Sequence, residues 1–316
     1  MRSQNPFSTQ LSFGITPSSN INNGSASDTA LFYGLEFPLS GDARALSGIE
    51  FSGSVNTRYQ LQASNTSATF LTASASAQTY MLSKAAQEQA PGVLGRDYSY
   101  GVIAVGARHN QILTEGGRPT EFSIRASKAW YGTDPYSHSF EASITHAWKL
   151  NETDKLVGTV TGQRTFTLSE KQEGMRKFTV EIPSTTFSLS GRWLRAYDNG
   201  NDLSLGADFR RNNSAAGDSD YQSVTYLANL DLAKPVSGMR FGFGFDYESR
   251  DYDFSTFANG PREDRSLGLN MTVNFADVEF YGFQPVVNLE ARRNESSYDL
   301  FDRNYGTIGF DLRSSF

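Results

Sequence analysis

The sequence predicts an all-β fold, a transmembrane antiparallel up-and-down β-barrel of 14 strands, from three observations. Apolar and polar residues alternate along most of the chain, which is the two-residue period of a strand with one apolar and one polar face. The connections alternate between short and long, as they do in outer-membrane barrels. Phe (23) and Tyr (15) are abundant although the mean hydropathy is −0.45, and no window holds the roughly 18 apolar residues of a membrane helix.

The alternation is clearest in the last third of the chain. From residue 239 onward, Met, Phe and Tyr occupy every second position, and Arg, Gly, Asp and Glu stand between them. The final segment, Tyr305–Phe316, places Phe310, Leu312 and the terminal Phe316 on one side. Apolar residues toward lipid and polar residues toward a lumen, in segments of about ten, are typical of a transmembrane barrel strand.

Strands are expected at regular intervals before this region. Two weak segments, Gln10–Thr16 and Ala30–Phe37, come first, and each is followed by a proline. The others are Leu46–Leu61, Thr66–Leu82, Tyr98–Arg108, Glu121–Tyr131, His138–Leu150, Lys155–Leu168, Ser184–Arg195, Asp202–Arg211, Ser223–Leu232, Met239–Tyr252, Arg265–Phe275, Glu279–Arg292 and Tyr305–Phe316. Because bacterial barrels have an even number of strands, we expect 14 rather than 16, with one weak segment outside the barrel wall.

The connections sort by length on alternate sides. Residues 151–154, 197–202, 233–238 and 275–278 are short turns, whereas 169–183, 212–221, 253–264 and 293–304 are long and polar. Residues 84–97 form another long loop, whose AAQEQA core favours one or two helical turns. Short turns are periplasmic in such barrels, so both termini are expected in the periplasm. We expect one barrel domain over residues 1–316, with residues 1–8 as a tail or the end of a periplasmic linker.

Composition argues against several classes of function. The chain has no Cys, which excludes disulfides and thiolate metal sites. Its net charge of −6 comes without a basic block, which argues against nucleic acid. The three histidines, His109, His138 and His146, stand outside any metal or hydrolase motif, and adjacent strand residues His138 and Ser139 point to opposite faces. We therefore expect no enzyme activity, catalytic residue, metal or cofactor.

Charged residues fall on the polar face of the predicted strands. They form a candidate lumen set: Arg192, Asp208, Arg210, Asp246, Glu248, Arg250, Glu290 and Arg292. One interpretation is a transport path, and the other is mutual pairing that fills the interior, because buried charges require partners. Pairing is favoured, and both interpretations are compatible if the lumen is hydrated.

Four stretches in order resemble the surface lipoprotein assembly modifier family. They are PSSNIN at 17–22, LEFPLSGDARALSG at 35–48, REDR at 262–265 and YGFQPVVNLEARRNESSYDLFDRN at 281–304. The individual matches are Asn20, Asn22, Ser47, Gly48, Arg262, Asp264, Gly282, Phe283, Pro285, Asn294 and Tyr298. The resemblance implies the C-terminal outer-membrane barrel of a translocator that carries lipoproteins, or related secreted cargo, to the cell surface.

Further expectations follow from this resemblance. Family members carry a periplasmic tetratricopeptide-repeat domain before the barrel, so this sequence is expected to begin inside a longer precursor. This expectation also accounts for a start, MRSQNPFSTQ, that lacks the apolar region of a signal peptide. Expected partners are outer-membrane lipids, a client lipoprotein or secreted cargo, and the barrel-assembly machinery, which would recognise Phe316. The barrel itself is expected to be monomeric.

A transport route at the junction of the first and last strands is the mechanistic hypothesis. A closed barrel satisfies all backbone groups in lipid, so a weak closing seam would let cargo pass sideways. The residues assigned to it are Gly282, Phe283, Pro285, Phe310, Leu312 and Phe316. Pro285 removes a ladder hydrogen bond within a predicted strand, and a bulge without mechanistic meaning is the alternative. A passive porin and a barrel hydrolase are the alternative functions.

Overall fold

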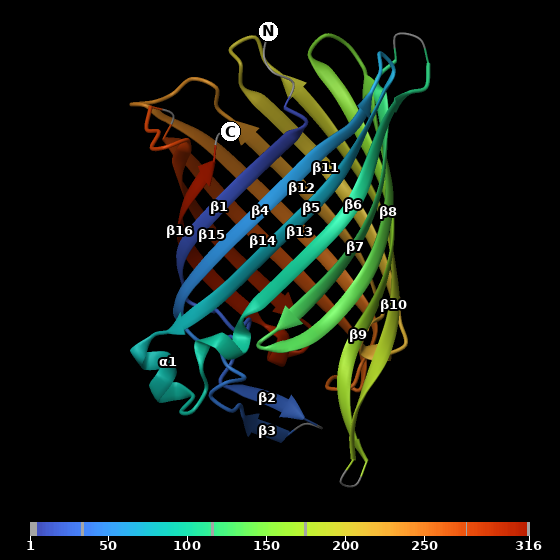
Figure 1. Cartoon of the computed structure of the whole chain (residues 1–316). Helices are drawn as coiled ribbons and strands as arrows, with labels where there is room; N and C mark the ends of the chain where they lie inside the picture. Colours follow the sequence, from blue (N-terminus) through green and yellow to red (C-terminus); the bar gives the residue numbers. More distant parts are fainter. Residues whose placement is uncertain (1–4, 33–34, 115–116, 174–175, 276, 315–316) are drawn as a thin grey trace.

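The computed structural model describes residues 5–32, 35–114, 117–173, 176–275 and 277–314. Its dominant feature is one closed barrel of 14 antiparallel strands (Figure 1). Each strand pairs with its neighbours along the chain, and β1 closes the ring by pairing with both β4 and β16. The predicted 14-stranded up-and-down barrel is confirmed.

The strands of the barrel are long and continuous. Their bounds are β1 Phe7–Ser18, β4 Gly48–Ala63, β5 Ser67–Leu82, β6 Tyr100–Ile112, β7 Pro119–Tyr131, β8 Asp134–Lys149, β9 Asp154–Glu173, β10 Arg176–Ala196, β11 Asp202–Ser214, β12 Tyr221–Asp231, β13 Met239–Ser255, β14 Gly260–Phe275, β15 Phe283–Ser296 and β16 Arg303–Ser314. Outside the barrel wall are β2 Thr29–Phe32, β3 Leu35–Pro38, the helix α1 Lys84–Gln89 and the 3₁₀ turns η1 Gly95–Tyr98, η2 Gly217–Ser219 and η3 Asp299–Phe301.

The two weak N-terminal segments form different structures. The first is a barrel strand, but it begins at Phe7, inside the expected tail, and continues through Pro17, where the sequence predicted its end. The second is a small separate hairpin of β2 and β3. One of the two segments therefore lies outside the barrel wall, as expected from the even strand number. The helical turns expected in the AAQEQA core are present as α1.

All four of the long loops expected between residues 169 and 304 are shorter than predicted because their strands continue, including 212–221, into which β11 extends to Ser214. The clearest case is 169–183, where β9 and β10 remain paired up to Glu173 and Arg176. This ribbon is the lowest part of the barrel in Figure 1. β13 and β14 also extend into 253–264, and β15 and β16 into 293–304. These stretches are mostly polar, so the sequence predicted loops there. Strands that extend past the apolar band of the barrel do not need apolar residues on their outer face.

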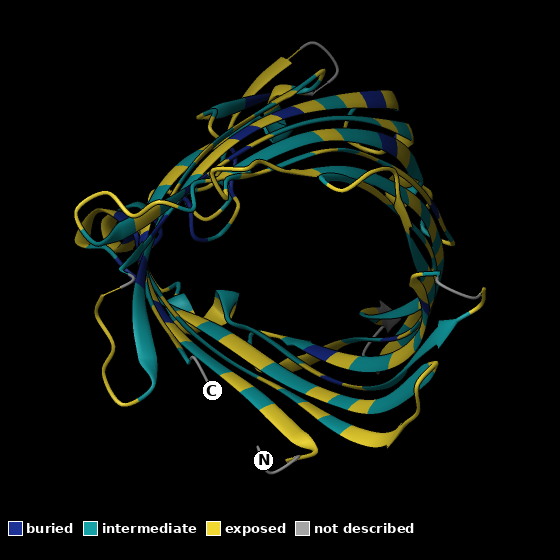
Figure 2. Cartoon of the chain, turned by 90° about the horizontal axis from the view of Figure 1, so that it is seen from above, coloured by how far each residue is buried: buried dark blue, intermediate teal, exposed yellow. Residues whose placement is uncertain are grey.

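The two ends of the barrel differ. Both termini lie at one end, and α1, the β2–β3 hairpin and the η turns lie at the other, which we call the loop end (Figure 1). Seen along the axis, bands of exposed and less exposed residues alternate along the strands of the ring (Figure 2). The apolar alternate residues, such as Phe140, Phe245 and Phe310, form the outer face. No described helix has the length and apolar character needed to cross a membrane.

A cluster of buried apolar residues lies at the loop end, beside the barrel wall. Ile21, Leu46, Leu82, Ala86 and Ala90 pack together there. They come from the connection between β1 and β4, from the end of β5 and from α1. Ser83 starts α1 by accepting a hydrogen bond from the Ala86 N–H (3.1 Å), a standard helix cap. This core fixes the β1–β4 connection, residues 19–47, which we call the cap segment.

Candidate functional site: the seam between the first and last strands

The seam is the junction of β1 and β16, and among the described residues it has the fewest paired positions of any junction in the barrel wall. Among the described residues, five Cα pairs join β1 to β16, whereas twelve join β1 to β4 and twelve join β15 to β16. The pairing runs from Ser12 to Ile15 and resumes at Ser18 without a change of register. Thr16 and Pro17, which pair with β4, are missing from the ladder on the β16 side.

The backbone direction at Pro17 explains this interruption. In an antiparallel sheet, the N–H and C=O of successive residues point to opposite neighbours. The Gln60 N–H donates to the Pro6 C=O (2.9 Å), so even-numbered residues of β1 point toward β4. Odd-numbered residues point toward β16, in agreement with the Leu11 N–H, which donates to Ser314 Oγ (2.8 Å). Pro17 therefore lacks the N–H that would bond to β16.

Pro285, which the sequence assigned to the seam, lies one strand away. It is on β15 and pairs with Leu312 of β16. Phe283 exchanges backbone hydrogen bonds with Phe280 across a turn in which Tyr281 and Gly282 have positive φ. By the same alternation, Pro285 points its missing N–H toward β14. Pro17, which the sequence showed only as the end of a short segment, is therefore the proline whose missing N–H faces the seam.

The other predicted seam residues lie around this junction. Phe310 and Leu312 are on β16, opposite Ile15 and Phe13 of β1, and both are about half exposed on the outer face. Together with residues of β14 and β15 they line an apolar groove of about 700 Å³ that crosses the seam. Phe283 begins β15 and Gly282 lies in the turn before it. Phe316 lies outside the described residues.

The cap segment closes the loop end of the seam. The Ala26 N–H donates to the Asp302 C=O (2.7 Å), and Ser25 Oγ donates to the Asp299 C=O (3.3 Å). The Tyr298 hydroxyl donates to the Leu31 C=O. These bonds join the cap to the β15–β16 connection, on the far side of the seam from β4. Burial raises the pKa of the Asp302 carboxyl, which accepts a hydrogen bond from the Ser296 N–H (2.7 Å).

The cap is also anchored on the near side of the seam. The hydroxyls of Ser47 and Ser83 are 2.7 Å apart, and the Ser83 N–H donates to the Ser47 C=O (2.9 Å). Gln89 Nε2 of α1 donates to the Gly41 C=O (2.8 Å). The cap segment therefore bridges β5 and α1 to the β15–β16 connection, and a separation of β1 from β16 at this end must break its far contacts.

Several residues that carry the family resemblance build this bridge. Asn22 Nδ2 donates to the C=O of Asp42 and Arg44 (2.9 and 2.8 Å), and its Oδ1 accepts from the Leu46 N–H (2.8 Å). Asn294 Nδ2 donates to the Phe301 C=O (2.9 Å). In the sequence, Asn22 and Asn294 are separate matches to the family. That both support the same bridge was not predictable, because the β1 end and the β15 end of the chain come close only when β16 closes the barrel.

Arg262 supports the far side of the bridge from within the barrel. Its guanidinium lies 3.8 Å from the ring centre of Tyr252 and 3.7 Å from that of Phe301, and its Nε is 3.1 Å from Asp264 Oδ1. The Ser296 hydroxyl donates to the same carboxylate oxygen (2.6 Å). Arg262 is 7% exposed, so its charge depends on these partners. They hold the 3₁₀ turn that contacts the cap.

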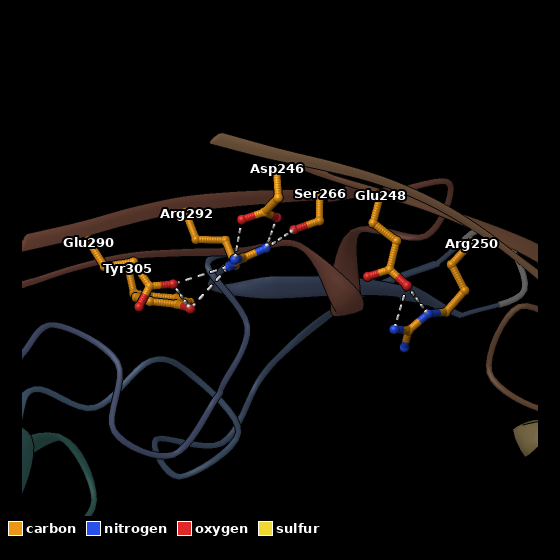
Figure 3. Close-up of polar contacts among 7 residues, drawn as sticks. All are labelled: Asp246, Glu248, Arg250, Ser266, Glu290, Arg292 and Tyr305. Carbon is orange, nitrogen blue, oxygen red and sulfur yellow. Dashed lines mark hydrogen bonds and ion pairs between the residues drawn. The ribbon is translucent and has the colours of Figure 1, made fainter. Parts of the chain in front are cut away.

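The predicted lumen charges lie on the inner face, where most of them pair. Arg292 bonds Asp246 through two nitrogens (2.7 and 2.9 Å) and also contacts Glu290 (3.4 Å) and the Tyr305 hydroxyl (3.2 Å) (Figure 3). Arg250 pairs with Glu248 (2.7 Å). Further along the same inner face, on β10 and β11, Arg192 pairs with Asp208 (2.7 Å), with Arg210 close to that carboxylate.

The histidines show no catalytic arrangement in the structure. His138 stacks on Phe166 with ring centres 4.9 Å apart, while Ser139 bonds the Ser127 hydroxyl on the other face. His146 packs against Trp148 (4.7 Å), the aromatic position predicted for it. Within the described ranges, no group of three or more His, Asp and Glu residues is placed to hold a metal ion.

A closed antiparallel barrel with an apolar outer face and a charged inner face is of the outer-membrane type. The model of the surface lipoprotein assembly modifier family matches residues 7–316. The chain belongs to this family, as the sequence motifs indicated. No curated protein sequence matches the chain.

Solved barrels are similar in overall shape only. The Acinetobacter baumannii protein OccAB3 is 9% identical, with 98% of each chain covered and a TM-score of 0.44. For Pseudomonas aeruginosa OccK8 (OprE) the identity is 8%, the coverage is 97% of each chain and the TM-score is 0.46. The beta domain of the Bordetella autotransporter BrkA is 10% identical over 98% of this chain and 100% of its own, with a TM-score of 0.38.

Proposed function

We propose that this barrel is a non-enzymatic translocator that delivers lipoproteins, or related secreted cargo, to the bacterial cell surface. It would reside in the outer membrane as a monomer, inserted by the barrel-assembly machinery, with both termini in the periplasm. Membership of the surface lipoprotein assembly modifier family supports the class of cargo. The long connections at one end and both termini at the other support this orientation.

The interrupted seam is the observation that carries the mechanism. Lipid offers no hydrogen-bond partners, so a barrel opens most readily where the fewest backbone bonds are broken. Here that position is the β1–β16 junction, which lacks the Pro17 N–H. Cargo with an acyl anchor needs a path on which the chain stays in a polar interior while the anchor stays in lipid. An opening between β1 and β16 provides both environments side by side.

The cap segment sets a condition on this opening. Its bonds to Asp299 and Asp302 span the loop end of the seam, so full opening requires their release. The near-side anchor at Ser47 and Ser83 need not break. The cap would therefore move with β1 and β4, away from β16 and its connection to β15.

Loss of the barrel in cells tests the proposal. Deleting the gene should remove at least one lipoprotein from the cell surface while its total cellular amount stays constant, measured by protease shaving of intact cells and mass spectrometry. Expression of the barrel from a plasmid should restore the display. Unchanged surface lipoproteins in the deletion strain, together with solute-selective conductance of the purified barrel in bilayers, would instead establish a passive channel.

A further inference from the structure

The projecting β9–β10 ribbon has strand edges that nothing in the described chain covers. We call its free part, residues 168–173 and 176–182, the arm. Pairing of β8 with β9 stops at Thr167, and pairing of β10 with β11 stops at Ser184. Beyond these points β9 and β10 pair only with each other. About six residues at about 3.3 Å each carry the arm roughly 20 Å past its neighbours.

The backbone groups on the β10 edge can be assigned from one hydrogen bond. The Ala215 N–H donates to the Pro183 C=O (2.9 Å), so odd-numbered residues of β10 point toward the β11 side. Beyond Pro183 these are Lys177, Thr179 and Glu181, and their N–H and C=O groups face outward with no neighbouring strand. Pro183 has no N–H on this side, which ends the ladder to β11.

An apolar stripe runs along the same strand. Phe178, Val180 and Ile182 are on the face of β10 that continues the inner wall, the face of Ser188 and Arg192. Phe178 is 43% exposed although it lies beyond the lipid-facing band. Their partners across the ribbon, Lys171, Ser169 and Thr167, are polar. Free backbone groups and apolar side chains are therefore combined on β10 and not on β9.

Most of the devices that keep a strand edge from pairing are missing from the arm. Natural proteins protect such edges with very short strands, bulges, prolines, covering loops or charged side chains, and of these the free β10 edge has the charged side chains of Lys177 and Glu181. The arm has no register shift between β9 and β10 and no proline between Phe178 and Ile182. The other free hairpin, β2–β3, has only four residues in each strand, and Tyr298 bonds its edge at Leu31.

We propose that the arm binds an extended segment of the transported polypeptide, which adds as an antiparallel strand to β10 at Lys177–Ile182. Unpaired N–H and C=O groups in strand geometry specify another extended backbone, and the stripe specifies alternate apolar side chains. The stripe continues the inner wall at the loop end, where cargo would emerge. The choice of cargo as the occupant rests on the proposed function, whereas the strand-binding edge itself does not.

Residue-resolved amide exchange on the purified full chain in detergent tests the edge. The probe is a capped eight-residue peptide of alternating Val and Thr. At ten times its Kd, the peptide should slow exchange of the Thr179 and Glu181 amides about ten-fold, because only the free fraction exchanges. Phe178 and Val180, whose amides already point to β9, should not change. No slowing at Thr179 and Glu181 with millimolar peptide would overturn the proposal.

Matched variants separate strand addition from loose adsorption. Thr179→Pro removes an outward N–H and should abolish the protection at Glu181, whereas Thr179→Val keeps the N–H and should preserve it. Equal protection in both variants would overturn strand addition. If exchange of these amides slows without peptide, and slows further as the barrel concentration rises, a second copy of the barrel occupies the edge. That result would also contradict the proposal.

The cargo assignment has its own readout in cells. Thr179→Pro should reduce surface display of the lipoprotein identified by gene deletion, and Thr179→Val should not. Normal display in the Thr179→Pro strain would refute the cargo as occupant while leaving the translocator intact. Unchanged display after deletion of the whole gene would reject the translocator function. The peptide experiment would still show whether the β10 edge binds an extended strand.

Discussion

A disulfide across the seam should stop transport if the seam opens. Ser12 of β1 and Arg313 of β16 are Cα partners on the inner face. They lie in a non-hydrogen-bonded pair, because even-numbered residues of β1 point toward β4, and such pairs have Cα atoms about 4.5 Å apart, within disulfide range. The chain has no Cys of its own, so Ser12→Cys with Arg313→Cys gives a single defined crosslink.

The size of the effect follows from the hydrogen bonds at the seam. Among the described residues, the hydrogen-bonded pairs joining β1 to β16 are Phe13 with Leu312 and Ile15 with Phe310. Each exchanges two bonds, and the Leu11 N–H donates one more to Ser314 Oγ, so at least five bonds join β1 to β16, against about twelve for the six such pairs between β1 and β4. A bond is worth about 1 kcal/mol where water can replace it and more in lipid, which offers no partner, so opening costs at least about 5 kcal/mol here and at least about 12 kcal/mol between β1 and β4. A covalent bond removes this low-energy route.

The assay is surface display of the client lipoprotein with and without a reductant. We expect the oxidised seam variant to lose display at least about ten-fold and to recover it on reduction. The matched control is Ser54→Cys with Ser76→Cys, a non-hydrogen-bonded inner-face pair between β4 and β5. It should display normally in both states. Full display by the oxidised seam variant would refute opening between β1 and β16.

Three further predictions concern single contacts. Pro17→Val should restore one seam bond of about 1 kcal/mol and lower the display rate about five-fold. Pro285→Val, whose N–H would face β14, should leave the rate unchanged. Equal rates in the two strains would count against the interruption at Pro17. Arg262→Met should leave the Asp264 carboxylate without its ion-pair partner at a cost of about 3 kcal/mol and expose 297–302 to protease on intact cells, and continued resistance would show that Arg262 does not hold the turn. Arg292→Met should lower the temperature at which the barrel unfolds in heat-modifiability gels, and adding Asp246→Leu should recover part of the loss; no recovery would argue against the Arg292–Asp246 pair as the cause.

Much of the barrel could be predicted from sequence because its signals are local. Alternation of residues such as Phe241, Phe243 and Phe245 depends only on the two-residue period of a strand, and it identified the wall. Strand ends were less predictable, because stretches such as 169–183 are mostly polar, and the alternating Phe178, Val180 and Ile182 lie on the face opposite to the apolar residues of the wall. The hairpin of β2 and β3 was not predicted, because the even strand count implied only that one of the two weak segments lies outside the wall.

The candidate site was harder to predict because it depends on closure. The sequence indicated that the first and last strands meet, but which proline weakens their junction depends on the direction of each N–H. Pro17 and Pro285 look alike in the sequence, and only the pairing of β1 and β15 shows that the first points to β16 and the second to β14. The cap bridge likewise joins Ala26 to Asp302, residues that no local pattern connects.

Capture of cargo in the act of passing tests the central claim most directly. A photo-crosslinking amino acid is placed at Phe310, on the outer face of the seam, and at Phe245, on the outer face of β13 away from it. Irradiation of cells during export of the client lipoprotein should crosslink the client at position 310 and not at position 245. Equal crosslinking at both positions, or none at position 310 while the client reaches the surface, would contradict passage through the seam.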